Sequence, residues 1–206
     1  MTTLLDIRTQ VARDLRDTSN ATWSTDELDD LINQGLDALA DFYPREIVQT
    51  IGTVASGTYS YAATSFTNAY RLDIYTSAGS YDGEIPHGIG GADSGWELHG
   101  NVVYLPPNWM PDAGDTLRLW GYGRYTQLAT DNDATDADTA GVNAVRVFCQ
   151  VEAFQRLLAN RVTFQQWQAS PGNTDTTVLG MNQIAFSAQR RWEREQRRLR
   201  RMRKLG

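Results

Sequence analysis

The spacing of apolar residues changes twice along the sequence, and this change limits the fold more than any other feature. Up to residue 46 and again from residue 143, apolar residues recur every three or four positions, as in amphipathic helices. Between residues 47 and 128, short segments rich in Val, Ile, Tyr, Trp and Thr alternate with Gly, Ser, Pro and Asn, as in strands and turns. We therefore expect an α+β fold, a helical bundle with a small antiparallel β-subdomain inserted into it.

Residues 1–46 are predicted to form a helical hairpin. The polar stretch 17–22 separates two apolar stripes of helical period, and Pro44 ends the second. Ser24 and Glu27 have the spacing of a capping box, in which each side chain bonds the backbone N–H of the other residue. The stripes comprise Leu4, Ile7, Val11 and Leu15, then Leu28, Leu31, Ile32, Gly35, Leu36 and Leu39.

The segment 47–128 is predicted to form the inserted antiparallel β-subdomain. Its pattern predicts strands near 47–55, 58–62, 70–76, 96–98, 102–105 and 115–125. Aromatic residues with nearby carboxylates could line a sugar site, although such residues are more often a core or a protein interface. The residues concerned are Tyr59, Tyr61, Tyr70, Tyr75, Tyr81, Trp96, Tyr104, Trp109, Trp120, Tyr122 and Tyr125, with Glu84, Asp93 and Glu97.

An acidic linker, 129–142, contains Asp131, Asp133, Asp136 and Asp138. A calcium-binding EF-hand loop that starts at Asp131 would place Asp136 where glycine is required. A loop that starts at Asp136 would place Val147 where the bidentate glutamate is required. The linker is therefore predicted to be solvated and to cap the helix that follows it.

Two long helices are predicted after the linker, a core helix over 143–169 and a basic helix over 176–206. The seam of the core helix comprises Val147, Val151, Phe154 and Leu158, widened by Phe148, Leu157 and Val162. The basic helix has a heptad seam: Val178, Met181, Ala185, Ala188, Trp192, Glu195, Leu199 and Met202.

Positive charge is concentrated at the end of the basic helix. Residues 190–206 hold eight arginines and the only lysine against two glutamates, a net charge of +7, whereas all other residues together carry −13. Such a helix could bind nucleic acid through phosphates, be a solvated helix end, or dock on an acidic protein surface. The apolar seam favours docking on protein, because phosphate binding requires only cations.

No catalytic, cofactor or metal site is predicted, and no enzyme activity. Cys149 lies among apolar residues of the core helix and is predicted to be buried, whereas a reactive thiolate needs exposure and a neighbouring cation. His87 and His99 have no partner at a metal-binding spacing. No apolar run approaches the length of a membrane span, so no membrane partner is expected.

Residues 23–33, WSTDELDDLIN, are similar to the W-S-x-x-E-L-x-x-x-I-N helix near the start of head-to-tail adaptor proteins of tailed bacteriophages. These proteins are also called connector or head-completion proteins, and the order of helices and strands resembles their longer members. The resemblance implies a structural virion protein that forms a ring, a dodecamer, beneath the portal. The ring extends the DNA channel and links the capsid to the tail, at the neck of the virion after assembly in the host cytoplasm.

The resemblance also implies partners: the portal protein, further copies of the chain, and a tail-side stopper, nozzle or tail-tube protein. Genomic DNA would be a non-specific passenger in the channel. Because the C-terminal segment of such adaptors reaches the portal, the portal-docking residues would be Arg190, Arg191, Trp192, Arg194, Arg197, Arg198, Leu199, Arg201, Met202, Arg203 and Lys204. Nucleic-acid binding through the basic helix and carbohydrate binding by the β-subdomain are the alternatives.

Overall fold

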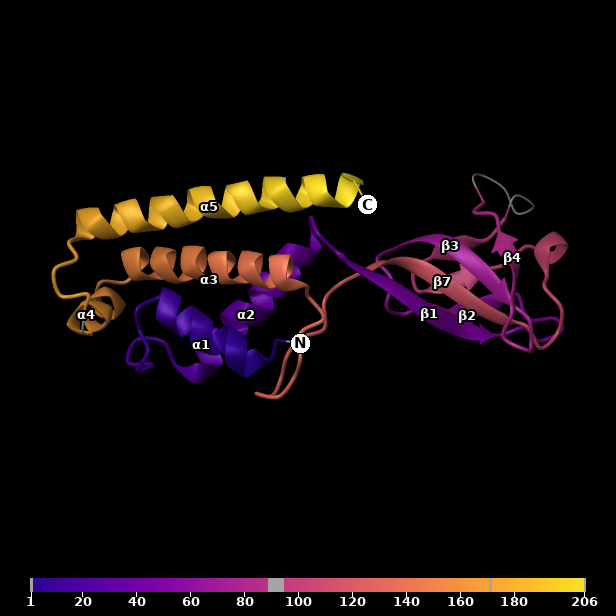
Figure 1. Ribbon diagram of the computed structural model, residues 1–206, viewed down its shortest axis with the longest axis horizontal. Helices are drawn as coiled ribbons and strands as arrows, with labels where there is room; N and C mark the ends of the chain where they lie inside the picture. The colour runs from indigo at the N-terminus through magenta and orange to yellow at the C-terminus, as the bar shows by residue number, and fades with distance from the viewer. Residues whose placement is uncertain (1, 89–94, 171, 206) are drawn as a thin grey trace. The chain divides into compact units, whose positions relative to one another are not determined.

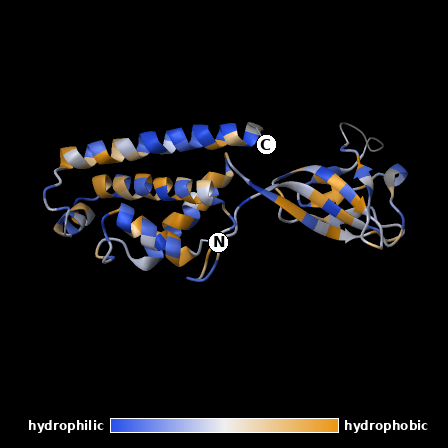
Figure 2. Cartoon of the chain, in the orientation of Figure 1, coloured by the Kyte–Doolittle hydropathy of each residue, from blue (hydrophilic) through white to orange (hydrophobic). Residues whose placement is uncertain are grey.

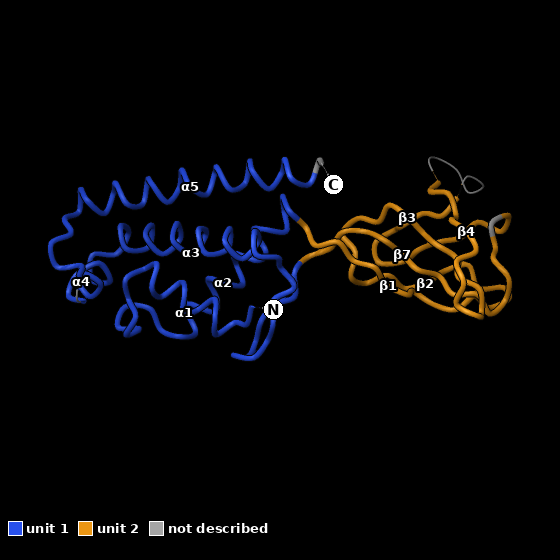
Figure 3. The backbone as a smooth tube through the Cα atoms, in the orientation of Figure 1, with its two compact units in different colours: residues 1–43, 125–206 blue, residues 44–124 orange. Residues whose placement is uncertain are grey.

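The computed structural model describes residues 2–88, 95–170 and 172–205, which form two compact units. Unit 1 comprises residues 1–43 and 125–206, and unit 2 comprises residues 44–124 (Figure 3). Unit 1 is helical, and unit 2 is built from antiparallel strands. The α+β fold with an inserted antiparallel β-subdomain is therefore confirmed.

Unit 1 is organised around one central helix, α3. It contains α1 (Leu4–Asp14), α2 (Thr25–Ala40), α3 (Thr139–Ala159), α4 (Arg161–Ala169) and α5 (Val178–Leu205). Helix α3 contacts each of the other four helices, and α5 packs along it on the side away from α1 and α2 (Figure 1). Burial on two sides explains why apolar residues of α3 form more than one stripe.

The helical hairpin begins each of its helices with a capping box. The predicted box is present in α2, where Ser24 N–H donates to Glu27 at 2.9 Å and Glu27 N–H donates to the Ser24 hydroxyl at 3.3 Å. A second box, Thr3 with Asp6, starts α1. In the turn between the helices, the buried Asp17 accepts three backbone N–H bonds. The hydrogen bonds from Ser24 hold the pKa of Glu27 below its usual value.

The single helix expected over 143–169 is two helices, and this expectation was wrong because of Asn160. The backbone of Asn160 is extended, with φ −123° and ψ 107°, and its side chain accepts the N–H groups of Val162 and Thr163 to cap α4. Since Asp138 caps α3 through Gly141 N–H at 2.6 Å, the helix also begins earlier than predicted. Leu158, expected in the seam, is 37% exposed, whereas Leu157 is 1% exposed.

Unit 2 contains a four-stranded and a three-stranded antiparallel sheet. The strands are β1 (Arg45–Thr53), β2 (Ser60–Ala62), β3 (Asn68–Tyr75), β4 (Tyr81–Ile85), β5 (Glu97–His99), β6 (Val102–Tyr104) and β7 (Thr116–Gly123). Their order is β1-β7-β3-β4 in one sheet and β2-β6-β5 in the other. Strand β4 was not predicted, because its sequence YDGEI has neither alternation nor β-branched residues before Ile85.

The inner face of unit 2 is apolar and closely packed. Strand β7 alternates buried and half-buried residues along its whole length, as its sequence predicts. A Cβ at Gly121 would come within 2.4 Å of the Asn68 carbonyl oxygen, so β3 and β7 approach too closely for a side chain there. The fully buried residues of this core include Leu72, Ile85, Trp96, Val103, Leu117 and Leu119.

Candidate interaction surface

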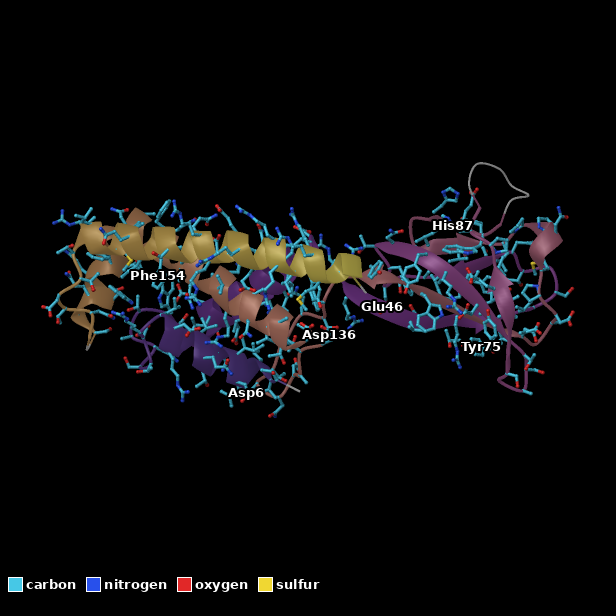
Figure 4. The ribbon with its side chains drawn as sticks, turned by 45° about the horizontal axis from the view of Figure 1, so that its top comes forward. Asp6, Glu46, Tyr75, His87, Asp136 and Phe154 are labelled. Atoms are coloured by element: carbon cyan, nitrogen blue, oxygen red, sulfur yellow. The ribbon has the colours of Figure 1, made fainter. Side chains whose placement is uncertain are left out.

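Helix α5 is anchored to unit 1 by an apolar seam. The buried residues of the seam are Met181, Ala185, Ala188, Trp192 and Leu199. The Trp192 ring meets Phe42 and Phe148, each edge-on with ring centroids 5.4 Å apart. Phe154 of α3 contributes to the groove beneath the first half of α5 (Figure 4). The core of unit 1 therefore includes α5.

The buried seam corrects two expectations about the basic helix: which of its residues face a partner, and where the seam begins and ends. Trp192 is 8% exposed and Leu199 is 0% exposed, so both lie within the chain itself rather than on a surface open to a partner. Val178 and Met202, predicted as the ends of the seam, are 60% and 43% exposed. The heptad pattern correctly identified a packing face, but that face packs on α3 and on Phe42, just after α2.

Four arginines lie on the side of α5 opposite the seam, and we call this set the arginine crest: Arg190, Arg194, Arg197 and Arg201. At about 3.6 residues per turn, the spacings of four, three and four residues place them on one face. All four are exposed, and the C-terminal half of α5 is hydrophilic over most of its surface (Figure 2). Within the described part of the chain, Arg194 and Arg201 have no hydrogen-bond or ion-pair partner.

The other two crest arginines have weak local partners. The Arg197 guanidinium is 3.7 Å from Glu193, and both side chains are largely exposed. The Arg190 guanidinium lies 4.4 Å from the centre of the Phe186 ring, and Phe186 is itself 58% exposed. Exposed pairs of this kind contribute about 0–1 kcal/mol, so the crest remains able to bind a carboxylate.

The remaining basic residues flank the crest. Arg191 donates to Gln150 at 3.3 Å, and Arg198 to Glu195 at 2.8 Å. Arg200, absent from the predicted docking set, lies 5.9 Å from the centre of the Phe42 ring; no local sequence signal links residues so far apart. Arg203 is exposed near the end of the helix, and the side chain of Lys204 lies outside the described residues.

The aspartates of the acidic linker are used for local structure. Asp131 pairs with Arg8 at 2.8 Å, Asp133 accepts the N–H groups of Ala129 and Thr130, and Asp138 caps α3. Asp136, labelled in Figure 4, accepts from the Thr126 hydroxyl at 2.9 Å. The predicted capping role is confirmed. Among the described residues, no three His, Cys, Asp or Glu side chains are grouped to hold a metal ion.

The cysteine and the two histidines occupy ordinary positions. Cys149 is fully buried as predicted, and burial raises the pKa of its thiol far above the usual range. His99 contacts the Glu97 carboxylate at 2.7 Å. His87, labelled in Figure 4, packs edge-on against Trp96 with ring centroids 4.5 Å apart.

The outer face of the four-stranded sheet in unit 2 carries most of the exposed and half-buried aromatic residues considered for a sugar site, whereas Tyr59 and Tyr104 lie at the other sheet. Arg71 lies over the Trp120 ring at 5.5 Å, and Arg118 over the Tyr75 ring at 4.0 Å. The Trp120 and Tyr75 rings therefore each have a guanidinium group over one face. Tyr61 and Trp96 are buried in the core, Tyr125 belongs to unit 1, and Asp93 and the side chain of Trp109 lie outside the described residues.

Comparison with known proteins connects these features to one family. The family model described as SU10 adaptor protein matches residues 2–203. No curated protein gives a match. None of the helices in the described residues has the length and apolar character needed to span a membrane. Since the family match covers both units and nearly all of α5, the chain belongs to the SU10 adaptor protein family, a family of phage adaptor proteins.

Proposed function

We propose that this phage adaptor protein assembles as a ring beneath the portal, where it extends the DNA channel and links the capsid to the tail. The observation that carries the proposal is the family match over residues 2–203, because it includes the basic helix as well as the body. The ring would be a dodecamer, with the portal on one side and a stopper, nozzle or tail-tube protein on the other. It would thus be a virion component at the portal vertex.

The end of α5 is the proposed portal contact. Met202 is 43% exposed and is flanked by the exposed Arg201 and Arg203. An exposed methionine with arginines on both sides combines an adaptable apolar contact with guanidinium groups that bind carboxylates in a bidentate manner. Because Trp192 and Leu199 fix the helix to the core of unit 1, this end is presented on a rigid support.

DNA is proposed to be a non-specific passenger. Outside residues 190–206 the chain has a net charge of −13, and such a body repels phosphates. Specific readout of a base sequence needs polar side chains placed against base edges, and we assign no residue of this chain to that task. Non-specific binding through the arginines remains the competing proposal.

Head completion by variants that alter the C-terminal end of α5 tests the proposed portal contact. Met202→Asp combined with Arg203→Glu should give DNA-filled heads that lack tails, because the altered end repels an acidic portal surface. The matched control is Arg161→Glu on α4, an exposed arginine outside the proposed contact, which should give normal heads. Normal tail attachment by the double variant would overturn the docking role.

DNA binding by the purified protein tests the competing proposal. If α5 acts on phosphates, affinity should fall steeply with salt, and each removed arginine contact should reduce the slope of log affinity against log salt by about 0.9. We expect weak binding that is unaffected by the DNA sequence.

Electron micrographs of completed heads test the ring itself. They should show a ring at the portal vertex, and the absence of a ring would contradict the proposed assembly.

A further inference from the structure

Helix α2 carries a charge pattern opposite to that of α5. Three aspartates lie on the face of α2 away from its buried residues and a fourth is its C-cap residue, and we call them the acidic crest: Asp26, Asp30, Asp37 and Asp41. The helix contains no lysine or arginine. Asp26, Asp30 and Asp41 are exposed, and Asp37 is half-buried. The charged residues on its outer face are therefore all acidic, whereas those of α5 are mainly basic; Asp37 and Asp41 also have interactions within their own chain.

The two crests lie on different faces of unit 1. Both helices pack on α3, with α5 on one side of it and α2 with α1 on the other (Figure 1). The two helices also run in the same direction relative to α3. Leu39, near the end of α2, meets Gly141 at the start of α3, while α5 begins beside Phe154 and reaches Phe148 only at Trp192. Both helices are therefore antiparallel to α3.

The charges on the two crests also share a spacing. Asp30, Asp37 and Asp41 are seven and four residues apart, and so are Arg190, Arg197 and Arg201. With a rise of about 1.5 Å per residue, each set spans roughly 16 Å along its helix. When two such helices lie side by side and parallel, three arginines meet three carboxylates in one register.

We propose that the arginine crest of one copy of this chain binds the acidic crest of a second copy. The inference deepens the proposed ring and rests on it, since it assigns the contact between neighbouring subunits. The contact uses two different patches of each subunit, so every subunit can bind one neighbour through each patch, and such head-to-tail contacts close into rings. A ring axis that runs parallel to these helices keeps α5 of one subunit parallel to α2 of its neighbour. The shared spacing of the charges requires this parallel orientation.

An apolar component adds to the charge match. Phe186 is 58% exposed beneath Arg190 and lies four residues before it, as Asp26 lies four residues before Asp30. In the matched register Phe186 therefore comes level with Asp26. The residue beside Asp26, Thr25, lines a groove that also contains Leu5, which is 47% exposed, and Arg13, whose guanidinium group can lie over an aromatic ring. This groove is the place for the Phe186 ring.

A charge-swap experiment tests the contact directly. One variant carries Arg190→Glu and Arg197→Glu, and the other carries Asp30→Arg and Asp37→Arg, the carboxylates that face these two arginines in the matched register. Each variant alone places like charges against each other and should raise the dissociation constant for self-association roughly tenfold or more in sedimentation. An equal mixture should restore wild-type assembly, because subunits that alternate around the ring have opposite charges at every contact. A mixture that assembles no better than the single variants would overturn the inference.

Cross-linking in completed heads separates this inference from the proposed function. A chain with Asp30→Cys and Arg190→Cys, which face each other in the matched register, treated with a short bis-maleimide, should give a ladder of dimers and higher species. The native Cys149 is fully buried and does not compete. The control pair, Asp30→Cys with Arg161→Cys, should give monomers. Incorporation into heads without a ladder would overturn the contact and leave the ring proposal standing, whereas failure of the wild-type chain to enter heads would overturn both.

Discussion

The outer face of α5 and the outer face of the four-stranded sheet in unit 2 both carry arginines, but they differ in how those charges are used. On the sheet, Asp73 is 1% exposed and accepts bonds from Arg71 at 2.6 Å and from the Trp120 indole at 2.8 Å. On α5, Arg194 and Arg201 have no partner within the described residues. The number of charges alone therefore does not identify a docking surface.

Other side chains on the outer face of the four-stranded sheet also have partners within the chain. Arg118 stacks on Tyr75, labelled in Figure 4, and Tyr70 donates its hydroxyl proton to Glu46, also labelled there. Burial together with this hydrogen bond raises the pKa of Tyr70 to about 12. A surface whose charges already have partners offers little free energy to a new one, since each existing contact must be replaced. The comparison favours α5 as the surface that binds.

The largest effect on stability should come from the buried side of α5. Trp192→Ala should destabilise unit 1 by about 3–5 kcal/mol, because it removes a buried ring that contacts Phe42 and Phe148. Chemical denaturation of this variant and of Asn182→Ala, a control at an exposed position of the same helix, measures the difference. A loss below about 0.5 kcal/mol, typical of surface positions, would mean that α5 is only loosely attached.

Much of the fold follows from local sequence signals. The change of apolar period predicted the fold class, and the spacing of Ser24 and Glu27 predicted the start of α2, because capping depends on residues three positions apart. The heptad stripe showed that Trp192 packs, but not against which surface. The break at Asn160 was missed, since asparagine is favoured at N-caps but also occurs inside helices, and only the surrounding fold decides which of the two it adopts.

The candidate interaction surface was likewise predictable from the sequence only in part. The positions of the crest arginines follow from charge pattern and helical period alone. The absence of partners for Arg194 and Arg201 among the described residues does not, because the carboxylates that pair with other arginines are far away in sequence. Arg8, for example, pairs with Asp29 and with Asp131. Contacts across such separations depend on packing, which a single sequence does not display.

A smaller effect should follow from removing the buried carboxylate of the sheet face. Asp73→Ala should destabilise unit 2 by about 1–3 kcal/mol, because the Trp120 indole N–H loses its acceptor and Arg71 loses its closest partner. The matched control is Glu84→Ala, whose carboxylate is 3.7 Å from Arg71 and 49% exposed. Equal stability of the two variants would show that the sheet face is not held by its own charges.

A capping carboxylate should give a measurable pH effect. Hydrogen bonds from Ser24 lower the pKa of Glu27 in the folded state, so its stabilising contribution is present above about pH 4.5 and is lost as the pH falls further. Glu27→Gln should therefore weaken the pH dependence of unfolding below about pH 4.5, whereas Thr25→Ala, a change of an exposed residue without an ionisable group in the same helical turn, should leave it unchanged. Parallel acid melts of the two variants and the wild type decide between these outcomes.

The smallest effect on stability is expected for changes in the arginine crest. Measuring it is the strictest test of the comparison between α5 and the sheet face. Arg194→Ala combined with Arg201→Ala should change the free energy of unfolding by no more than about 0.5 kcal/mol, because neither side chain is buried and neither has a described partner. The same variant should weaken self-association, since the missing guanidinium groups are those available to a second copy. Thermal unfolding and sedimentation on one preparation measure both quantities. A variant that loses stability and association together would show that the crest supports the subunit, and the contrast with the sheet face would then disappear.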